Sequence, residues 1–434
     1  MEAQRSRREA YARLTADGVT LLVAAPTARR SNDVDYEYRP DSDFYYLTGF
    51  PEPEAALLLV PAPEVRMILF VRPRNPERET WDGPRAGLDG ARDLYGADEV
   101  FPIDELEAVV RRHLEACDRL YFGFGADPAM DAKIPTWLNH ARGRRRGGVN
   151  AVHTVSDAAT VLHELRLRKD EHDLAALRRA AEISARAHRA AMQAARPGLW
   201  EYELEALIEY HFAAAGATFG YPSIVGSGRN ATILHYIENR RRIEPGDLIL
   251  IDAAAEVDCL TADLTRTFPV DGRFTRPQRE LYEIVLEAEI AAIDAARPGA
   301  SFDAPHTAAL RVLVSGLLRL GLLQGELEEH LVGTAYRRYF MHRTSHWLGM
   351  DVHDAGSYKL GGEWRPLESG MVLTVEPGLY IPIDDETVPE QYRGLGVRIE
   401  DDLLVTTTEP EVLTAAAPKL AQEIEALMSA TRVG

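Results

Sequence analysis

Two kinds of hydrophobic pattern follow each other along the chain. Before residue 165, short apolar runs punctuated by proline and glycine predict strands with helical segments among them. From Lys169 onward, apolar residues recur at helical spacing, and Asp173 is a candidate N-cap for the first of these segments. The predicted elements are a helix over 2–14, strands over 20–25, 55–60 and 65–71, and helices over 103–116, 174–196, 201–215, 277–296 and 305–320.

This order of elements predicts two domains, residues 1–168 and 169–434. A chain of 434 residues is longer than one ordinary core supports, which agrees with a division into two. The first domain mixes helices and strands as an α/β domain. The second has a pair of helices followed by a hairpin-rich stretch, twice over, which is typical of an α+β domain with antiparallel strands and helices packed on one face.

The second domain is organised around residues 248–268. An apolar run leads to Asp252, a polar interruption follows, and a second segment carries Asp263, which predicts two strands joined by a turn. A turn centred between Val257 and Asp258 would place the two aspartates directly opposite each other, about 4.5–5.5 Å apart at Cβ, where like charges are destabilising. Two solvated acids beside a turn are the ordinary alternative. However, an acid that ends an apolar strand enters the interior, so we expect a cation between them.

A second copy of this arrangement lies downstream. Residues 244–252 align with residues 368–376, and Glu376 then corresponds to Asp252. The chain returns to Glu400, which plays the part of Asp263 in the second copy. The pentapeptide Ala-Ala-Arg-Pro-Gly also occurs at 194–198 and again at 295–299. We therefore predict a duplicated domain in which four carboxylates meet at a pseudo-twofold axis.

Composition limits the classes of partner. The formal net charge of −19 gives no basic footprint for nucleic acid or an anionic membrane, so neither is expected as a partner. Cys117 and Cys259 are the two cysteines, too few for a disulfide framework. The charged N-terminus does not resemble a signal peptide, and the apolar runs are too short to span a bilayer. We expect a cytoplasmic protein.

Two histidines between the acid-bearing hairpins are candidates to join the carboxylates. His346 and His353 are seven positions apart, so on a straight strand they would face opposite sides, one as a ligand and the other reaching the site from a different wall. A histidine beside tryptophan is more often a packing residue. Four acids and one imidazole suit Mn, Fe, Co or Zn, and two ions can share bridging carboxylates.

Arg398 and His235 are two further candidate residues of the site. Arg398 is two residues before Glu400 and could orient that carboxylate, with a plain surface ion pair as the alternative. His235 follows a Gly-Ser-Gly segment that is too short for a phosphate loop and is better interpreted as a turn shaping a pocket wall.

These motifs carry a family resemblance over nearly the whole chain. Asp252 with Asp263, Ser-His-Trp-Leu-Gly at 345–349, Thr-Val-Glu-Pro-Gly at 374–378 and Arg-Ile-Glu-Asp at 398–401 resemble the pita-bread metallopeptidases, most closely their aminopeptidase P group. Residues 42–50 are similar to the creatinase-like N-terminal domain of that group. The resemblance implies removal of the first residue from peptides with proline second, by a hydroxide that bridges two divalent ions, usually manganese.

The resemblance also implies roles for individual residues. Asp252 would bind one ion, His346 and Glu376 the other, and Asp263 and Glu400 would bridge both. Glu376 would also handle the proton. His353 would contact the scissile amide, and His235 would line the substrate pocket. Tyr380 and Arg398 would lie beside the ligands. Trp81 would be an aromatic residue that reaches the site of a neighbouring subunit in a dimer or tetramer.

Alternatives stay open at this point. A prolidase would share every ligand and differ in accepting only Xaa-Pro dipeptides, and a non-catalytic pita-bread module would lack the metal. One departure is that Ala158 and Ala159 stand where the related enzymes carry Trp-Arg, which bears on long-peptide recognition and on assembly.

Overall fold

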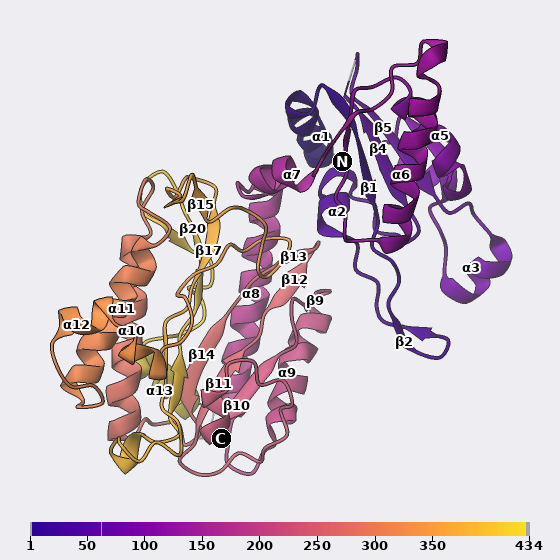
Figure 1. Cartoon of the computed structure of the whole chain (residues 1–434). Coiled ribbons are helices and arrows are strands. Elements are labelled where there is room, and N and C mark those ends of the chain that lie inside the picture. The colour runs from indigo at the N-terminus through magenta and orange to yellow at the C-terminus, as the bar shows by residue number, and fades with distance from the viewer. Residues whose placement is uncertain (1, 62, 431–434) are drawn as a thin grey trace. The chain divides into compact units, whose positions relative to one another are not determined.

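The first part of the chain is built on one mixed sheet of six strands (Figure 1). The computed structural model describes residues 2–61 and 63–430. The sheet strands are β1 (Gly18–Val23), β4 (Ala56–Val60), β5 (Arg66–Val71), β6 (Glu99–Pro102), β7 (Arg119–Tyr121) and β8 (Thr154–Ser156). They lie in the order β6-β5-β4-β1-β7-β8, with β4 antiparallel to both of its neighbours and the other pairs parallel. A two-stranded ribbon, β2 (Arg29–Ser31) and β3 (Val34–Asp35), lies apart from this sheet.

Helices accompany the sheet, and most of them pack on it or on one another. They are α1 (Glu2–Leu14), α2 (Ser42–Thr48), α3 (Pro76–Asp82), α4 (Gly87–Asp93), α5 (Leu106–Leu114), α6 (Pro128–Gly143) and α7 (Ala159–Arg166). Helix α1 has the predicted bounds, whereas the segment predicted as a helix from Ile103 starts with a 3-10 turn before α5. Leu58, Ile68 and Trp137 belong to the buried cluster between the sheet and its helices, so the apolar runs predicted as strands mark a real core.

The second part contains four long helices and several short antiparallel sheets. Its helices are α8 (Glu171–Ala194), α9 (Glu201–Ala214), α10 (Arg276–Ala295), α11 (Ala304–Arg319), α12 (Leu327–Val332) and α13 (Ala421–Ala430). Its strands are β9 (Thr218–Phe219), β10 (Ile224–Ser227), β11 (Leu248–Asp252), β12 (Ala255–Val257), β13 (Leu260–Thr261), β14 (Thr265–Pro269), β15 (Lys359–Leu360), β16 (Glu363–Trp364), β17 (Val372–Val375), β18 (Gly378–Tyr380), β19 (Gly396–Arg398), β20 (Asp401–Leu404) and β21 (Glu411–Val412). The predicted α+β class of this domain is confirmed.

The chain divides into two compact units, Met1–Arg166 and Leu167–Gly434. The boundary predicted after residue 168 lies two residues further on. At the start of the second unit, Asp170 is the N-cap of α8, and Asp173 is the third helical residue that completes a capping box. The expected N-cap at Asp173 was therefore three residues late. Among the described residues, no helix combines the length and hydropathy that crossing a bilayer requires.

The internal duplication is visible in backbone hydrogen bonds. The amide of Gly198 donates to Ile243 O, and the amide of Gly299 donates to Leu367 O, at 2.8 and 2.7 Å. Both glycines have positive φ, 95° and 83°, a conformation that explains why glycine ends the repeated pentapeptide. Each half therefore fastens the loop between its two helices to the turn that precedes its central strand.

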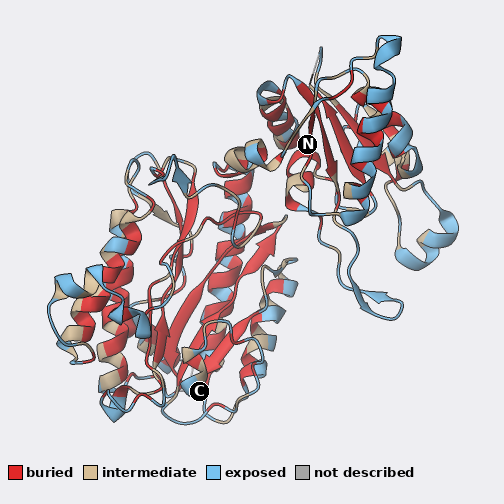
Figure 2. Ribbon diagram, viewed as in Figure 1, coloured by how far each residue is buried: buried red, intermediate tan, exposed pale blue. Residues whose placement is uncertain are grey.

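Helices and strands form layers within this unit. Helix α8 packs on β12 and β13, α9 packs on β9 and β10, and α10 packs on β17, β18 and β19. The central strands are buried along their length, while the outer faces of the long helices are exposed (Figure 2).

The register of the central hairpin differs from the expectation. Asp252 lies opposite Thr265, and Val257 lies opposite Leu260, so the turn is centred on Asp258 and Cys259 and not between Val257 and Asp258. Both turn residues have positive φ, 51° and 62°, as a two-residue type I′ turn requires. The shift is two positions, so Asp263 keeps the same face as Asp252 and becomes its diagonal neighbour.

This turn predicts a stabilising substitution. Cys259 has a left-handed backbone conformation that costs free energy in a residue with a Cβ and that glycine adopts without strain. Cys259→Gly is therefore expected to stabilise the second unit by about 1 kcal/mol. Calorimetry should show the corresponding unfolding transition raised by about 1–3 °C. Asp258→Gly is the matched comparison and should gain less, because aspartate tolerates this region better. A lowered transition for Cys259→Gly would contradict the turn assignment.

Candidate metal centre

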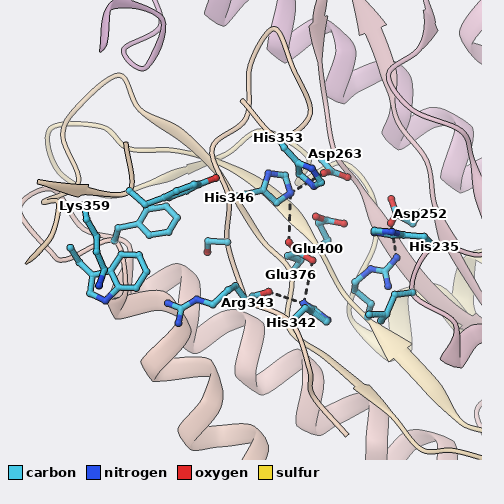
Figure 3. A pocket seen from close by; sticks show the side chains of 16 residues that line it. His235, Asp252, Asp263, His342, Arg343, His346, His353, Lys359, Glu376 and Glu400 are labelled. Carbon is cyan, nitrogen blue, oxygen red and sulfur yellow. Dashed lines mark hydrogen bonds and ion pairs between the residues drawn. The ribbon is translucent and has the colours of Figure 1, made fainter. Parts of the chain in front are cut away.

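A cavity of about 640 Å³ opens among the strand ends of the second unit. Figure 3 shows its side chains pointing toward one another from both halves of the duplication. The residues predicted from the sequence that line it are Asp252, Asp263, His346, Glu376, Glu400, His235, His353 and Arg398. The structure therefore brings together all five predicted metal ligands and three of the other predicted site residues.

The two aspartates of the first half share a tyrosine. The hydroxyl of Tyr221 lies 2.7 Å from Asp252 Oδ1 and 2.6 Å from Asp263 Oδ1, and it can donate its proton to one of them at a time. Burial and the two nearby carboxylates raise the pKa of Tyr221 well above its ordinary value. Burial also raises the pKa of Asp252, and Asp263 adds to this against the effect of Arg398. Both pKa values are raised because negative charge is concentrated here away from water.

The glutamates of the second half are held in the same way. Strand β17 pairs with β20, and β18 pairs with β19, in the same register. This register places Glu376, between β17 and β18, directly opposite Glu400. The hydroxyl of Thr265 donates to Glu400 Oε2 at 2.6 Å, so a residue of the first half orients a carboxylate of the second. Burial, with the neighbouring acids, raises the pKa of Glu376 to about 7 and that of Glu400 well above its usual range. Direct opposition of two acids thus occurs in the second copy, not the first.

His346 completes a compact set of donor atoms. Ligand atoms of Asp263, His346 and Glu400 all lie within 4.8 Å of one another. The Nε2 atom of His346 is 3.4 Å from Asp263 Oδ2 and 3.6 Å from Glu376 Oε1, whereas Nδ1 is 3.0 Å from Trp347 O. A proton on Nδ1 donates to that carbonyl and leaves Nε2 as the donor atom for a cation. Burial lowers the pKa of this imidazole, but Asp263 and Glu376 outweigh it and raise the value to about 9.

His353 faces the same cavity as His346. The two rings are 4.5 Å apart and nearly perpendicular. The expectation that they reach the site from different walls assumed a straight strand, but residues 345–354 form an irregular loop that can turn both rings the same way. Burial and the neighbouring His346 lower the pKa of His353, which favours a neutral ring that can donate a hydrogen bond. His235 lies beside Asp252 in Figure 3, on the wall formed by the first half.

Arg398 contacts a different ligand from the one expected. Its Nη2 donates to Asp252 Oδ2 at 2.6 Å, its Nη1 to the hydroxyl of Tyr380 at 3.1 Å, and its Nε to Thr265 Oγ1 at 3.1 Å. The hydrogen bonds of Arg398 therefore lead to Glu400 through Thr265. The ion pair with Asp252 is buried, so the surface alternative is excluded. Tyr380 is buried behind Arg398 and is not among the residues that line the cavity.

Trp81 lies in the first unit, whereas the cavity is lined by residues of the second. It belongs to the short helix α3, and 82% of its surface is exposed. Its role toward a neighbouring subunit stays a prediction.

Sequence reasoning missed His342, which lines the cavity, and Tyr221 and Thr265, which hold its carboxylates. The Nε2 atom of His342 is 2.9 Å from the Tyr380 hydroxyl, and Nδ1 is 3.6 Å from Glu376 Oε2. Its place four residues before His346 was the signal that could have found it. Tyr221 and Thr265 had no signal of their own, because their roles follow from the hairpin register and from contacts between the two halves.

Charged residues beneath the strands hold the ligand backbone. Both carboxylate oxygens of Asp402 accept from the amide of Asp263 at 3.1 Å. The guanidinium of Arg266, fully buried, donates to Glu400 O at 2.7 Å and pairs with Asp401 Oδ1 at 2.6 Å. These contacts fix the main chain on either side of the carboxylates that the two halves contribute.

The donor set fits divalent cations. Oxygen donors with one imidazole nitrogen are ligands that Mn, Fe, Co and Zn accept. Three of the four acids are buried and Glu376 is half-buried, and the cations that contact them among the described residues are Arg398 and the protonated ring of His346. Two single positive charges beside four acids leave negative charge that needs further compensation. A divalent ion supplies it.

Known proteins share this architecture. Residues 175–407 match the metallopeptidase family M24, and residues 4–121 match the aminopeptidase P N-terminal domain. The chain is 45% identical to Xaa-Pro aminopeptidase of Escherichia coli strain K12, covering 99% of this chain and 98% of that one. It is 35% identical to human Xaa-Pro aminopeptidase 3, covering 98% and 83%.

Solved structures show the same likeness over the full chain. Aminopeptidase PepP of Pseudomonas aeruginosa superposes with a TM-score of 0.97 at 49% identity, covering 99% of this chain and 98% of that one. An Escherichia coli aminopeptidase P variant, with a glutamate replaced by alanine and substrate bound, superposes with a TM-score of 0.96 at 44% identity, covering 100% and 99%.

The chain belongs to the metallopeptidase family M24. Within that family, its N-terminal domain and its full-length relatives group it with the aminopeptidase P enzymes, and it is a metal-dependent aminopeptidase. The two-domain fold predicted from the sequence, with a creatinase-like domain before a pita-bread domain, is confirmed. The same matches favour the aminopeptidase over the prolidase and the non-catalytic module.

The raised pKa values predict that cation binding releases protons. Glu376, with a pKa of about 7, and Glu400, with a higher than usual pKa, must lose protons to bind a cation, and so must the imidazolium of His346. Affinity for manganese should therefore fall as pH is lowered from 8 to 6. Titration calorimetry in buffers of different ionisation enthalpy measures the protons released. Binding that releases none, with an affinity independent of pH, would contradict the charge arrangement described above.

Proposed function

We propose that this aminopeptidase removes the N-terminal residue from peptides with proline at the second position, using two divalent ions, with Mn²⁺ preferred over Co²⁺, Zn²⁺ and Fe²⁺. The observation that carries the proposal is the convergence of Asp252, Asp263, His346, Glu376 and Glu400 on one cavity. Full-length relatives named Xaa-Pro aminopeptidase support the substrate class.

Different cavity residues have different roles in hydrolysis. Bound divalent ions supply a polarising charge and make a nucleophile available at neutral pH. Glu376, a carboxylate at the edge of the ligand set, takes a proton from the nucleophilic side and returns it to the leaving nitrogen. His353 donates to the scissile carbonyl oxygen as negative charge develops there, and His235 holds the substrate on the opposite wall.

Proline explains why a dedicated site is needed. The bond between the first residue and proline is a tertiary amide without an N–H, so a site that uses that donor for recognition fails on it. Recognition must then come from the shape of the cavity and from contacts to the carbonyl groups. Arg398 and Tyr380 hold Asp252 and the wall behind it, so they act on substrate through the ligands they position.

Assembly and location belong to the same proposal. We infer a homodimer or homotetramer in which the exposed Trp81 reaches the cavity of a neighbouring subunit, as the family resemblance implies. Replacement of the related Trp-Arg pair by Ala158 and Ala159 weakens one further contact of that kind. A reducing compartment, the cytoplasm, suits a chain whose cysteines lie in different units and form no disulfide.

Two substitutions separate metal binding from chemistry. Asp263→Ala removes a carboxylate that would hold both ions, so it should abolish turnover and reduce the bound metal while leaving the circular dichroism spectrum unchanged. His353→Ala should keep the metal and lower kcat by about 10²-fold or more, the usual effect of removing one transition-state donor. Metal quantitation and kinetics on both proteins measure this, with the exposed Asp294→Ala as control. Retained turnover by Asp263→Ala at saturating manganese, or metal loss by His353→Ala, would reverse these roles.

A peptide panel tests the substrate class. With manganese, Xaa-Pro-Yaa should be cleaved after Xaa, Xaa-Pro should be a poorer substrate, and Xaa-Ala-Yaa should not be cleaved at a comparable rate. Mass spectrometry of the products identifies the bond that is broken. Activity confined to Xaa-Pro dipeptides would replace the proposal with a prolidase.

A further inference from the structure

A small hairpin forms the end of the cavity farthest from His235 in Figure 3. Strands β15 and β16 pair antiparallel, with Lys359 directly opposite Trp364. Gly361 and Gly362 make the turn with φ of 59° and 93°, the geometry of a type I′ turn, which side chains at both positions would strain. The turn thus fixes the register that places a lysine and a tryptophan side by side at the rim.

An aromatic cluster anchors this hairpin. The ring of Phe302 lies 4.5 Å from Trp347, 4.9 Å from Tyr358 and 6.0 Å from Trp364, measured between centroids. Tyr358 also stacks on Trp347 with an angle of 4° between the rings. The backbone amide of Phe302 donates to Arg365 O at 2.9 Å. Trp364 therefore lies on a packed support and not on a loose loop.

Two cations flank Trp364. The Nζ atom of Lys359 is 4.5 Å from the centroid of the ring, and Cζ of Arg343 is 4.9 Å from it. Arg343 is paired with Asp303, whereas no carboxylate among the described residues lies within ion-pair distance of Lys359. This end of the cavity therefore keeps a positive charge, and the far end holds four carboxylates.

We propose that Lys359, supported by Trp364, forms a subsite for a carboxylate on the part of the peptide that follows proline. This inference rests on the proposed function and names its preferred substrates: short Xaa-Pro peptides that end in a free carboxylate or carry an acidic side chain after proline. Tryptophan contacts the peptide chain, and the lysine ammonium binds the carboxylate.

The charge distribution across the cavity supports this orientation. The N-terminal ammonium of a peptide lies toward the acids and cations of the metal centre, and a carboxylate two or more residues later lies toward Lys359. The reverse orientation would bring the N-terminal ammonium of the peptide toward Lys359, and the two positive charges would repel each other. The subsite thus aligns the scissile bond. Its contact with the carboxylate stabilises the bound substrate and the transition state equally, so it lowers KM and leaves kcat unchanged.

Matched peptides test the subsite. For the manganese-loaded wild type, Xaa-Pro-Ala with a free carboxylate should have a KM about threefold to tenfold lower than its C-terminal amide, with a similar kcat. Adding salt should reduce the difference. Comparing the KM of Xaa-Pro-Asp-amide with that of Xaa-Pro-Ala-amide shows whether an acidic side chain can supply the carboxylate in place of the chain terminus.

Lys359→Met should bring the amide-to-acid ratio of KM values close to one. Glu363→Gln, on the same hairpin, and Lys133→Met, in the first unit, are controls that should retain the preference of the wild type. A wild type that cleaves acid and amide peptides equally well, or a Lys359→Met variant that keeps the full preference, overturns the subsite and leaves the proposed function standing. A wild type that cleaves no Xaa-Pro peptide overturns both.

Discussion

Mutual repulsion of four clustered carboxylates is the constraint on which the second unit depends. Asp252, Asp263, Glu376 and Glu400 come from four strand ends, and all of them are buried except Glu376, which is half-buried. Raised pKa values at three of them express the cost of that placement. A protein keeps such an arrangement only if something positive balances it or if its chemistry requires it. Divalent cations satisfy both conditions.

The fold stabilises this arrangement with positive charge and hydrogen bonds on every side. Arg398 neutralises part of the charge at Asp252, and Tyr221 and Thr265 donate to carboxylate oxygens. Beneath the strands, Arg266 and Asp402 hold the backbone of the ligands, so that the carboxylates cannot separate. Many of these contacts cross between the two halves of the duplication. Each half supplies groups that the other needs, which explains why one half alone would not make the site.

The sequence predicted the fold well where local pattern controls it. The apolar strands, the long helices and the duplication followed from periodicity and from the repeated pentapeptide, and motif resemblance brought in the candidate ligands. The register of the hairpin was wrong by two residues, because a turn on Asp258 and Cys259 lacks the glycine that usually marks a type I′ turn. The relation of His346 to His353 was wrong because an irregular loop has no fixed side-chain alternation. Contacts such as Arg398 with Asp252 depend on tertiary packing, which no local pattern specifies.

Anomalous diffraction from crystals grown with manganese tests whether the carboxylate cluster holds two ions. We expect two peaks in the anomalous difference map at the manganese edge, both within the cavity, with Asp263 and Glu400 contacting both ions and Asp252, His346 and Glu376 contacting one ion each. A map without peaks there at saturating manganese, or with ions bound by other residues, would contradict this expectation.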